Sequence, residues 1–174
     1  RNNIQVPFIT CQEMLRYNQG KDLALWELAI LYESARGSLT HDQVMEKMRE
    51  IVRILQTSIQ EGIRGKQYAD RILGHQSGKF QTLMDQGRLL EGGMLNRMIL
   101  YVTALMEVKS SMGVIVAAPT AGACGGLPGA CLGAADALGS SQDEVTRAML
   151  AAGMIGVFIA AHATFAAEVG GCQA

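Results

Sequence analysis

The stretch "GVIVAAPTAGACGGLPGACLGAADALG", residues 113–139, is nearly all small or apolar and carries two cysteines and two prolines. Such a segment has little with which to bind a ligand except its backbone and its thiols. With 49% apolar and only 5% aromatic residues, the whole chain favours closely packed helices over strands. We therefore expect an all-α fold, a compact multi-helix domain with a glycine-rich loop.

Capping boxes at residues 10–13, 40–43 and 141–144 mark three helix starts in the flanking sequence. The third is expected to open a buried apolar C-terminal helix that runs through Ala167. The second leads into a strongly amphipathic segment, whose apolar stripe consists of Val44, Met48, Ile51, Leu55 and Ile59.

The remaining segments are less regular. Asp22 is expected to cap a helix that stops at Gly37. Glycines interrupt residues 62–93, which predict short helices and loops, and residues 94–113 return to helical periodicity. Residues 114–118 are compatible with a strand or with buried extended coil.

The bulk composition limits the partners and the location of the protein. Fifteen basic against sixteen acidic residues give a net charge of −1, so we expect neither a nucleic acid nor an anionic membrane surface as a partner. The longest apolar run, residues 151–167, is shorter than the roughly 20 residues that span a bilayer. No charged leader precedes an apolar segment, so we expect a cytoplasmic protein.

We expect one helical catalytic domain over residues 1–174, truncated at its C-terminus. The length suits a single domain with a sizeable core. The chain begins with Arg1 rather than Met and stops shortly after a glycine turn, which indicates that part of the working unit lies outside it.

The glycine-rich loop has the features of a small anion site. Pro119 favours extended backbone before it, and the glycines allow a bound group to approach the main chain closely. If a helix follows, its first amides point back at the loop and favour a carboxylate. The candidate substrate-binding residues are Thr120, Ala121, Gly122, Ala123 and Gly125. The alternative is a simple turn between two buried elements.

Two of the four cysteines lie in glycine turns at expected helix ends, Cys124 within the loop and Cys172 near the end of the chain. Helix amides would lower the pKa of the Cys124 thiol, which makes it a candidate nucleophile, redox thiol or metal ligand. The alternative is a small buried residue. Cys131, within a predicted helix, is interpreted as structural.

The candidates for acid–base chemistry are weak. His162 lies within the apolar C-terminal helix, where a core role is the default interpretation, and Glu168 stands near the end of that helix. Lys109 is interpreted as a solvated helix end. The sequence does not choose a general base among these residues.

Two blocks, "MGVIVAAPTAGACGGLPG" at 112–129 and "ATFAAEVGGCQA" at 163–174, strongly resemble the α chain of bacterial iron–sulfur-dependent L-serine dehydratase. The similarity runs from about residue 59 to the C-terminus. The chain departs from the commoner family pattern EVGCQ by one additional glycine before Cys172, which changes the spacing ahead of that cysteine.

The resemblance implies an all-helical lyase that converts L-serine into pyruvate and ammonia in serine catabolism, with a [4Fe–4S] cluster as cofactor. It implies Cys124 and Cys172 as cluster ligands and a third ligand beyond the second block. We therefore expect an incomplete or absent cluster in this chain. It also implies an oligomer and a β chain as partner where the family's small β domain is a separate subunit.

Two other functions stay open. In one, Cys124 and Cys172 pair reversibly in a helical redox or metal-sensing protein. In the other, the methionine-rich faces of a helical interaction subunit bind a partner, and the glycine loop is only a tight turn.

Overall fold

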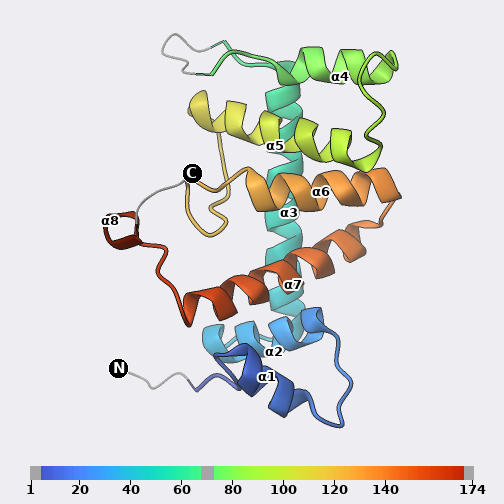
Figure 1. Cartoon of the computed structure of the whole chain (residues 1–174). Coiled ribbons are helices and arrows are strands. Elements are labelled where there is room, and N and C mark those ends of the chain that lie inside the picture. Colours follow the sequence, from blue (N-terminus) through green and yellow to red (C-terminus); the bar gives the residue numbers. More distant parts are fainter. Residues whose placement is uncertain (1–4, 68–72, 171–174) are drawn as a thin grey trace. The chain divides into compact units, whose positions relative to one another are not determined.

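A computed structural model describes residues 5–67 and 73–170 (Figure 1). Within these ranges the chain forms helices and no strand, which confirms the predicted all-α class. In chain order the helices are α1 (Cys11–Asn18), α2 (Leu25–Gly37), α3 (His41–Arg64), α4 (Ser77–Asp85), α5 (Met94–Ser110), α6 (Gly126–Leu138), α7 (Gln142–Ala160) and α8 (Ala167–Gly170).

The chain divides into two compact units. The first unit comprises residues 1–50 and 146–174, and the second comprises residues 51–145. The long helices α3 and α7 contribute residues to both units. The prediction of a single catalytic domain concerns function as well as compactness, so this division does not test it and it stays a prediction.

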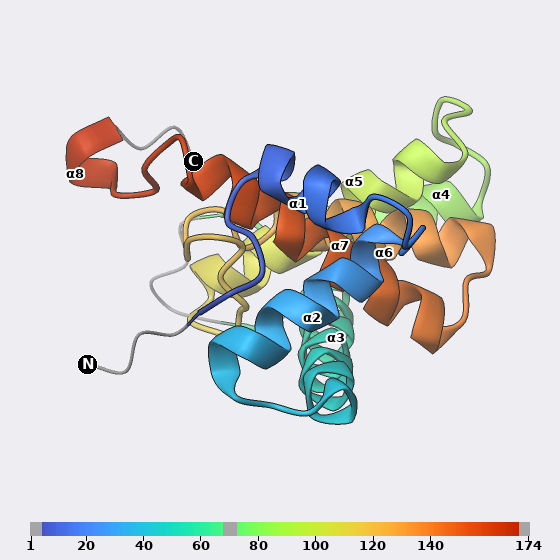
Figure 2. The same ribbon diagram turned by 90° about the horizontal axis from the view of Figure 1, so that it is seen from below.

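The first unit is built around one apolar cluster. Helices α1 and α2 pack together with the first turns of α3 and most of α7 (Figure 2). The ring of Phe8 lies 5.4 Å from that of Tyr17 and 6.1 Å from that of Tyr32, measured between centroids. The buried members of the cluster are Phe8, Met14, Leu28, Ala29, Ile30, Val44, Leu150 and Met154.

All three predicted capping boxes are present, and they begin α1, α3 and α7. The N–H of Glu13 donates to the Thr10 hydroxyl at 3.2 Å, and the N–H of Thr10 donates to the Glu13 carboxylate at 3.1 Å. The boxes at 40–43 and 141–144 show the same reciprocal bonds. Each box satisfies amides that the first helical turn leaves without an intrahelical partner.

The predicted cap of α2 is wrong. Asp22 has a positive φ of 51° and does not precede the helix directly. The N-cap is Ala24, whose N–H donates to the carboxylate of Glu27 at 2.8 Å. The acidic side chain that satisfies this helix start therefore comes from within the first turn and not from the residue before it.

The C-terminal apolar helix is shorter than predicted, because α7 ends at Ala160 and not at Ala167. The hydroxyl of Thr164 accepts the N–H of Ala166 at 3.1 Å, which gives that amide an alternative to a helical partner. The helix is also buried along one side only, since Ile155 is 50% exposed. Residues 114–118 form coil, so the strand alternative is wrong.

In the second unit, α5 and α6 lie antiparallel and side by side (Figure 1). Buried glycines of α6 face the backbone of α5. A Cβ on Gly129 would lie 2.6 Å from the Cα of Val102, and a Cβ on Gly133 would lie 2.6 Å from the Cα of Met98. The absence of side chains at these two positions lets the helices approach each other closely.

The same kind of contact occurs at two further points on α5. Gly125, the N-cap of α6, packs on the side chain of Met106, and Gly62 of α3 packs on the backbone of Ala104. Helix α5 is therefore held at short range by both α3 and α6.

We predict that Gly129→Ala destabilises the second unit by about 1–3 kcal/mol, because the added methyl group meets backbone atoms that cannot rotate away. Gly126→Ala, at the first residue of the same helix, is the matched control, since a Cβ there has open space. The free energy of unfolding, measured by urea titration, checks both variants. Equal effects of the two substitutions would contradict this account of the α5–α6 contact.

Candidate functional site

The loop of residues 113–125 connects α5 to α6 and is tied down at its start. The buried Ser58 hydroxyl donates to the carbonyl of Val114 at 2.8 Å. The N–H of Gly113 donates to the carbonyl of Val108 at 2.9 Å. The first residues of the loop are thus fixed to α3 and α5.

Within the loop, the N–H of Ala123 lies 3.1 Å from the carbonyl oxygen of Thr120 and 3.2 Å from its hydroxyl. This amide is engaged by the loop itself. In the part of the chain that the structure describes, the N–H groups of Ala121, Gly122 and Gly125 meet no acceptor in hydrogen-bonding geometry. The predicted substrate-binding segment therefore contains amides that are able to donate to a ligand.

Cys124 is fully buried, at 0% exposure, where the loop meets α6. Desolvation by burial raises the pKa of its thiol, and this outweighs the lowering by the nearby Lys109 charge and by the cysteine's own backbone N–H. The predicted lowering of the Cys124 pKa is therefore wrong, because the apolar surroundings dominate.

Lys109 does not form the solvated helix end that the sequence predicts. It lies in the last turn of α5, is partly buried, and places its Nζ 3.4 Å from the carbonyl oxygen of Gly122. Sequence reasoning missed this contact because the loop folds back over thirteen residues. Its position directly before a long uncharged segment is the signal that could have indicated it.

The other predicted residues are placed as follows. Cys131 is partly buried on α6 and burial raises its pKa, which is consistent with a structural role. His162 is exposed after the end of α7 and so is not the core residue that the sequence predicts. Glu168 is exposed on α8. Cys172 lies outside the described residues.

The structure therefore brings together Cys124, Lys109 and the predicted substrate-binding segment, all in the second unit. His162 and Glu168 belong to the first unit, and the structure does not assign them to a common site with the loop. Their role as bases stays a prediction.

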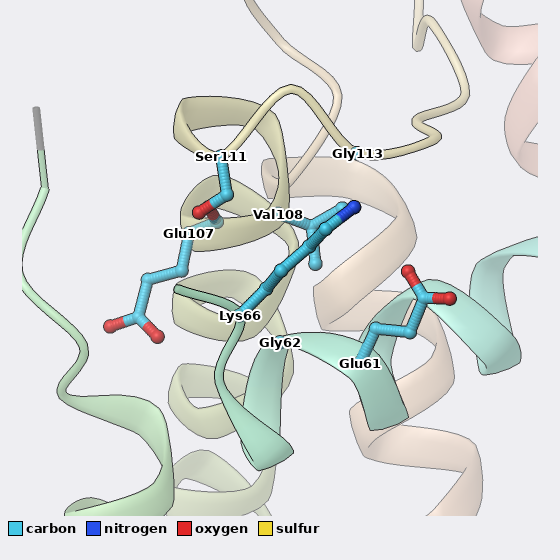
Figure 3. A pocket seen from close by; sticks show the side chains of 7 residues that line it. All are labelled: Glu61, Gly62, Lys66, Glu107, Val108, Ser111 and Gly113. Atoms are coloured by element: carbon cyan, nitrogen blue, oxygen red, sulfur yellow. The ribbon is translucent and has the colours of Figure 1, made fainter. Parts of the chain in front are cut away.

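A shallow hollow lies beside the start of the loop (Figure 3). The side chain of Lys66 runs toward Gly113, while the side chain of Glu107 points away from Gly113. The free volume of about 10 Å³ holds at most one water molecule, so the hollow has no room for an amino acid. It is lined by Glu61, Gly62, Lys66, Glu107, Val108, Ser111 and Gly113.

Glu107 is a buried carboxylate that the sequence analysis missed. It accepts the N–H of Gln76 at 2.7 Å, the N–H of Ser77 at 3.2 Å and the Ser77 hydroxyl at 2.6 Å. These bonds satisfy the first amides of α4 from a neighbouring helix. A single acidic residue within the apolar sequence of α5 is the signal that could have indicated it.

The two ends of the segment between α3 and α4 lie next to each other. Gly65, with φ +79°, faces the ring of His75, and a Cβ there would lie 2.6 Å from the ring carbon Cε1. The Nε2 of His75 lies 3.1 Å from the carbonyl oxygen of Ile63. The two ends of the segment are therefore in contact with each other.

The described residues supply only part of the predicted metal site. Across residues 5–67 and 73–170, no group of three or more His, Cys, Asp or Glu side chains is arranged to hold a metal ion. Cys124 offers one thiol next to the loop, and its predicted companion Cys172 lies outside these ranges. In the same ranges, no helix combines the length and apolar character needed to cross a bilayer.

The fold and the loop define a helical protein whose candidate site is a cysteine-bearing glycine loop at a helix N-terminus. The model of the family described as "Serine dehydratase alpha chain" matches residues 20–174, and the chain therefore belongs to this family. This confirms the resemblance that the sequence blocks predict.

Three relatives illustrate the similarity. The chain is 25% identical to the probable L-serine dehydratase, alpha chain, of Bacillus subtilis over 96% of this chain and 56% of the relative. It is 24% identical to the L-serine dehydratase, alpha chain, of Peptoniphilus asaccharolyticus over 95% of this chain and 57% of the relative. It is 27% identical to the L-serine dehydratase of Streptomyces coelicolor over 98% of this chain and 38% of the relative. The chain thus spans about half the length, or less, of these relatives, and no solved structure matches it.

We predict that, without iron, Cys124 reacts with iodoacetamide at least about tenfold more slowly than the exposed Cys11 at about pH 8. The thiolate is the reactive form, and burial both blocks access and raises the Cys124 pKa. Raising the pH should therefore accelerate labelling of Cys124. Timed labelling followed by peptide mass spectrometry measures both rates, and equally fast labelling at about pH 8 would show that Cys124 is not buried.

Proposed function

We propose that the protein containing this chain is an iron–sulfur-dependent L-serine dehydratase, which eliminates water from L-serine to give pyruvate and ammonia. Family membership and the names of the relatives support the reaction class. The observation that carries the proposal for this chain is the loop, where amides without acceptors lie beside a buried cysteine.

The loop binds the carboxylate of L-serine in this proposal. The N–H groups of Ala121 and Gly122 donate to the carboxylate oxygens, and the Thr120 hydroxyl adds a third donor. Gly125, at the N-cap of α6, contributes its amide at the positive end of the helix dipole. These contacts hold the Cα and Cβ atoms of the substrate at a fixed place next to Cys124.

Cys124 and Cys172 are the proposed cluster ligands of this chain. When bound, a [4Fe–4S] cluster with an open iron supplies Lewis-acid stabilisation of the hydroxyl group that leaves. A general base takes the Cα proton, for which His162 and Glu168 are the candidates on this chain. Loss of the proton and the hydroxyl group gives aminoacrylate and water, and water then hydrolyses aminoacrylate to pyruvate and ammonia.

We also propose a β chain as partner. The support is the designation "alpha chain" in the names of two relatives.

The test uses the intact protein that contains this chain, prepared without oxygen and reconstituted with iron and sulfide. We expect pyruvate from L-serine, and we expect Cys124→Ala to lower its rate by more than about 100-fold. Cys131→Ala is the matched control, since Cys131 is a partly buried cysteine of the same region and is given no ligand role. Its turnover should equal that of the unchanged protein.

Three outcomes would contradict the proposal. A reversible Cys124–Cys172 disulfide formed without iron, together with no pyruvate, would favour the redox function. Full activity of the Cys124→Ala variant would contradict the role of Cys124 as a cluster ligand, and no pyruvate from any variant, without a disulfide, would favour the interaction subunit.

A further inference from the structure

Lys109 is a partly buried cation beside the loop. Its Nζ donates to the carbonyl of Gly122 over a long 3.4 Å, and this is its one hydrogen bond within the described ranges. An ammonium group has three donors, so this weak bond leaves most of its capacity available.

Nothing in the adjoining sequence neutralises this charge. Residues 110–135 contain no Asp, Glu, Lys, Arg or His. The nearest carboxylate along the helix, that of Glu107, is engaged by the first residues of α4. No carboxylate of the described residues forms an ion pair with Lys109. A cation removed partly from water is stabilised when an anion of opposite charge comes within contact distance.

The direction of the Lys109 side chain is supported by a second observation. Among the described residues, its positive charge is the one side-chain charge that acts to lower the pKa of the buried Cys124 thiol. The charge of Lys109 thus acts on the Cys124 thiol, and its Nζ contacts the Gly122 carbonyl of the same loop.

We propose that Lys109 is a substrate-binding residue, whose ammonium group pairs with the carboxylate of L-serine at the loop formed by Thr120–Gly125. The identity of the ligand rests on the proposed function. A carboxylate accepts about four hydrogen bonds, so it can take donors from Lys109 and from the loop amides together. The charge makes this site selective for a carboxylate over its neutral amide.

The test measures binding of L-serine and of L-serinamide by isothermal titration calorimetry, with the intact protein prepared without iron so that L-serine is not turned over. We expect the unchanged protein to bind L-serine at least about tenfold more tightly than L-serinamide, because hydrogen bonds to charged groups are stronger than neutral ones. Lys109→Met should lose this preference, mainly through weaker binding of L-serine.

Two further variants serve as controls. Lys79→Met removes an exposed lysine of α4 and should keep the full preference. Lys109→Arg keeps the positive charge and should retain most of the preference for L-serine over L-serinamide. Melting temperatures of all variants show whether a loss of binding follows from a loss of folding.

The inference is overturned if Lys109→Met keeps the preference for L-serine. It is also overturned if Lys109→Met lowers the affinities for L-serine and for L-serinamide to the same extent, since Lys109 would then only hold the loop in place. Equal binding of both ligands by the unchanged protein, or binding of neither, overturns it as well.

A pyruvate assay on reconstituted samples of the same variants separates this inference from the proposed function. Absence of pyruvate from the unchanged protein contradicts the proposed function, while the binding preference is still measured. Pyruvate formation with the same preference in the Lys109→Met variant contradicts the role of Lys109 alone.

Discussion

The close approach of α5 and α6 is the contact on which the candidate site depends. Gly129 of α6 faces Val102 of α5, and Gly133, four residues later, faces Met98, four residues earlier. The two helices therefore run antiparallel in a defined register. This register fixes the C-terminal end of α5 next to the N-terminal end of α6. Because Lys109 lies in the last turn of α5 and Cys124 comes just before α6, the glycine contacts also hold these two side chains at the same place.

The helix boundaries that depend on neighbouring residues could be predicted from the sequence. The three capping boxes are confirmed because their bonds join residues three apart, and the apolar stripe of α3 is confirmed in its buried residues such as Leu55 and Ile59. The errors concern helix boundaries, since Ala24 and not Asp22 precedes α2 and α7 ends at Ala160. Beyond the end of α7, the Thr164 hydroxyl accepts the N–H of Ala166, a local bond that periodicity does not detect.

The chemical environment of the site could be predicted less well than its location. The loop was identified from its composition, but the pKa of Cys124 depends on how deeply tertiary packing buries it. Glu107 was missed and the contact of Lys109 was not predicted, because their partners Ser77 and Gly122 lie thirty and thirteen residues away along the chain. The pattern of small residues indicated close helix packing in general, whereas the choice of partner helix required the three-dimensional register.

The contact between Gly65 and His75 has a consequence for how this chain can be engineered. The chain leaves the end of α3 and re-enters the helical body at nearly the same point. A change in the length of the connecting stretch then alters an entropy of loop closure that grows only with the logarithm of length. The stretch is therefore a natural insertion point for an extra module or a reporter sequence, with α4 and its cap from Glu107 left in register.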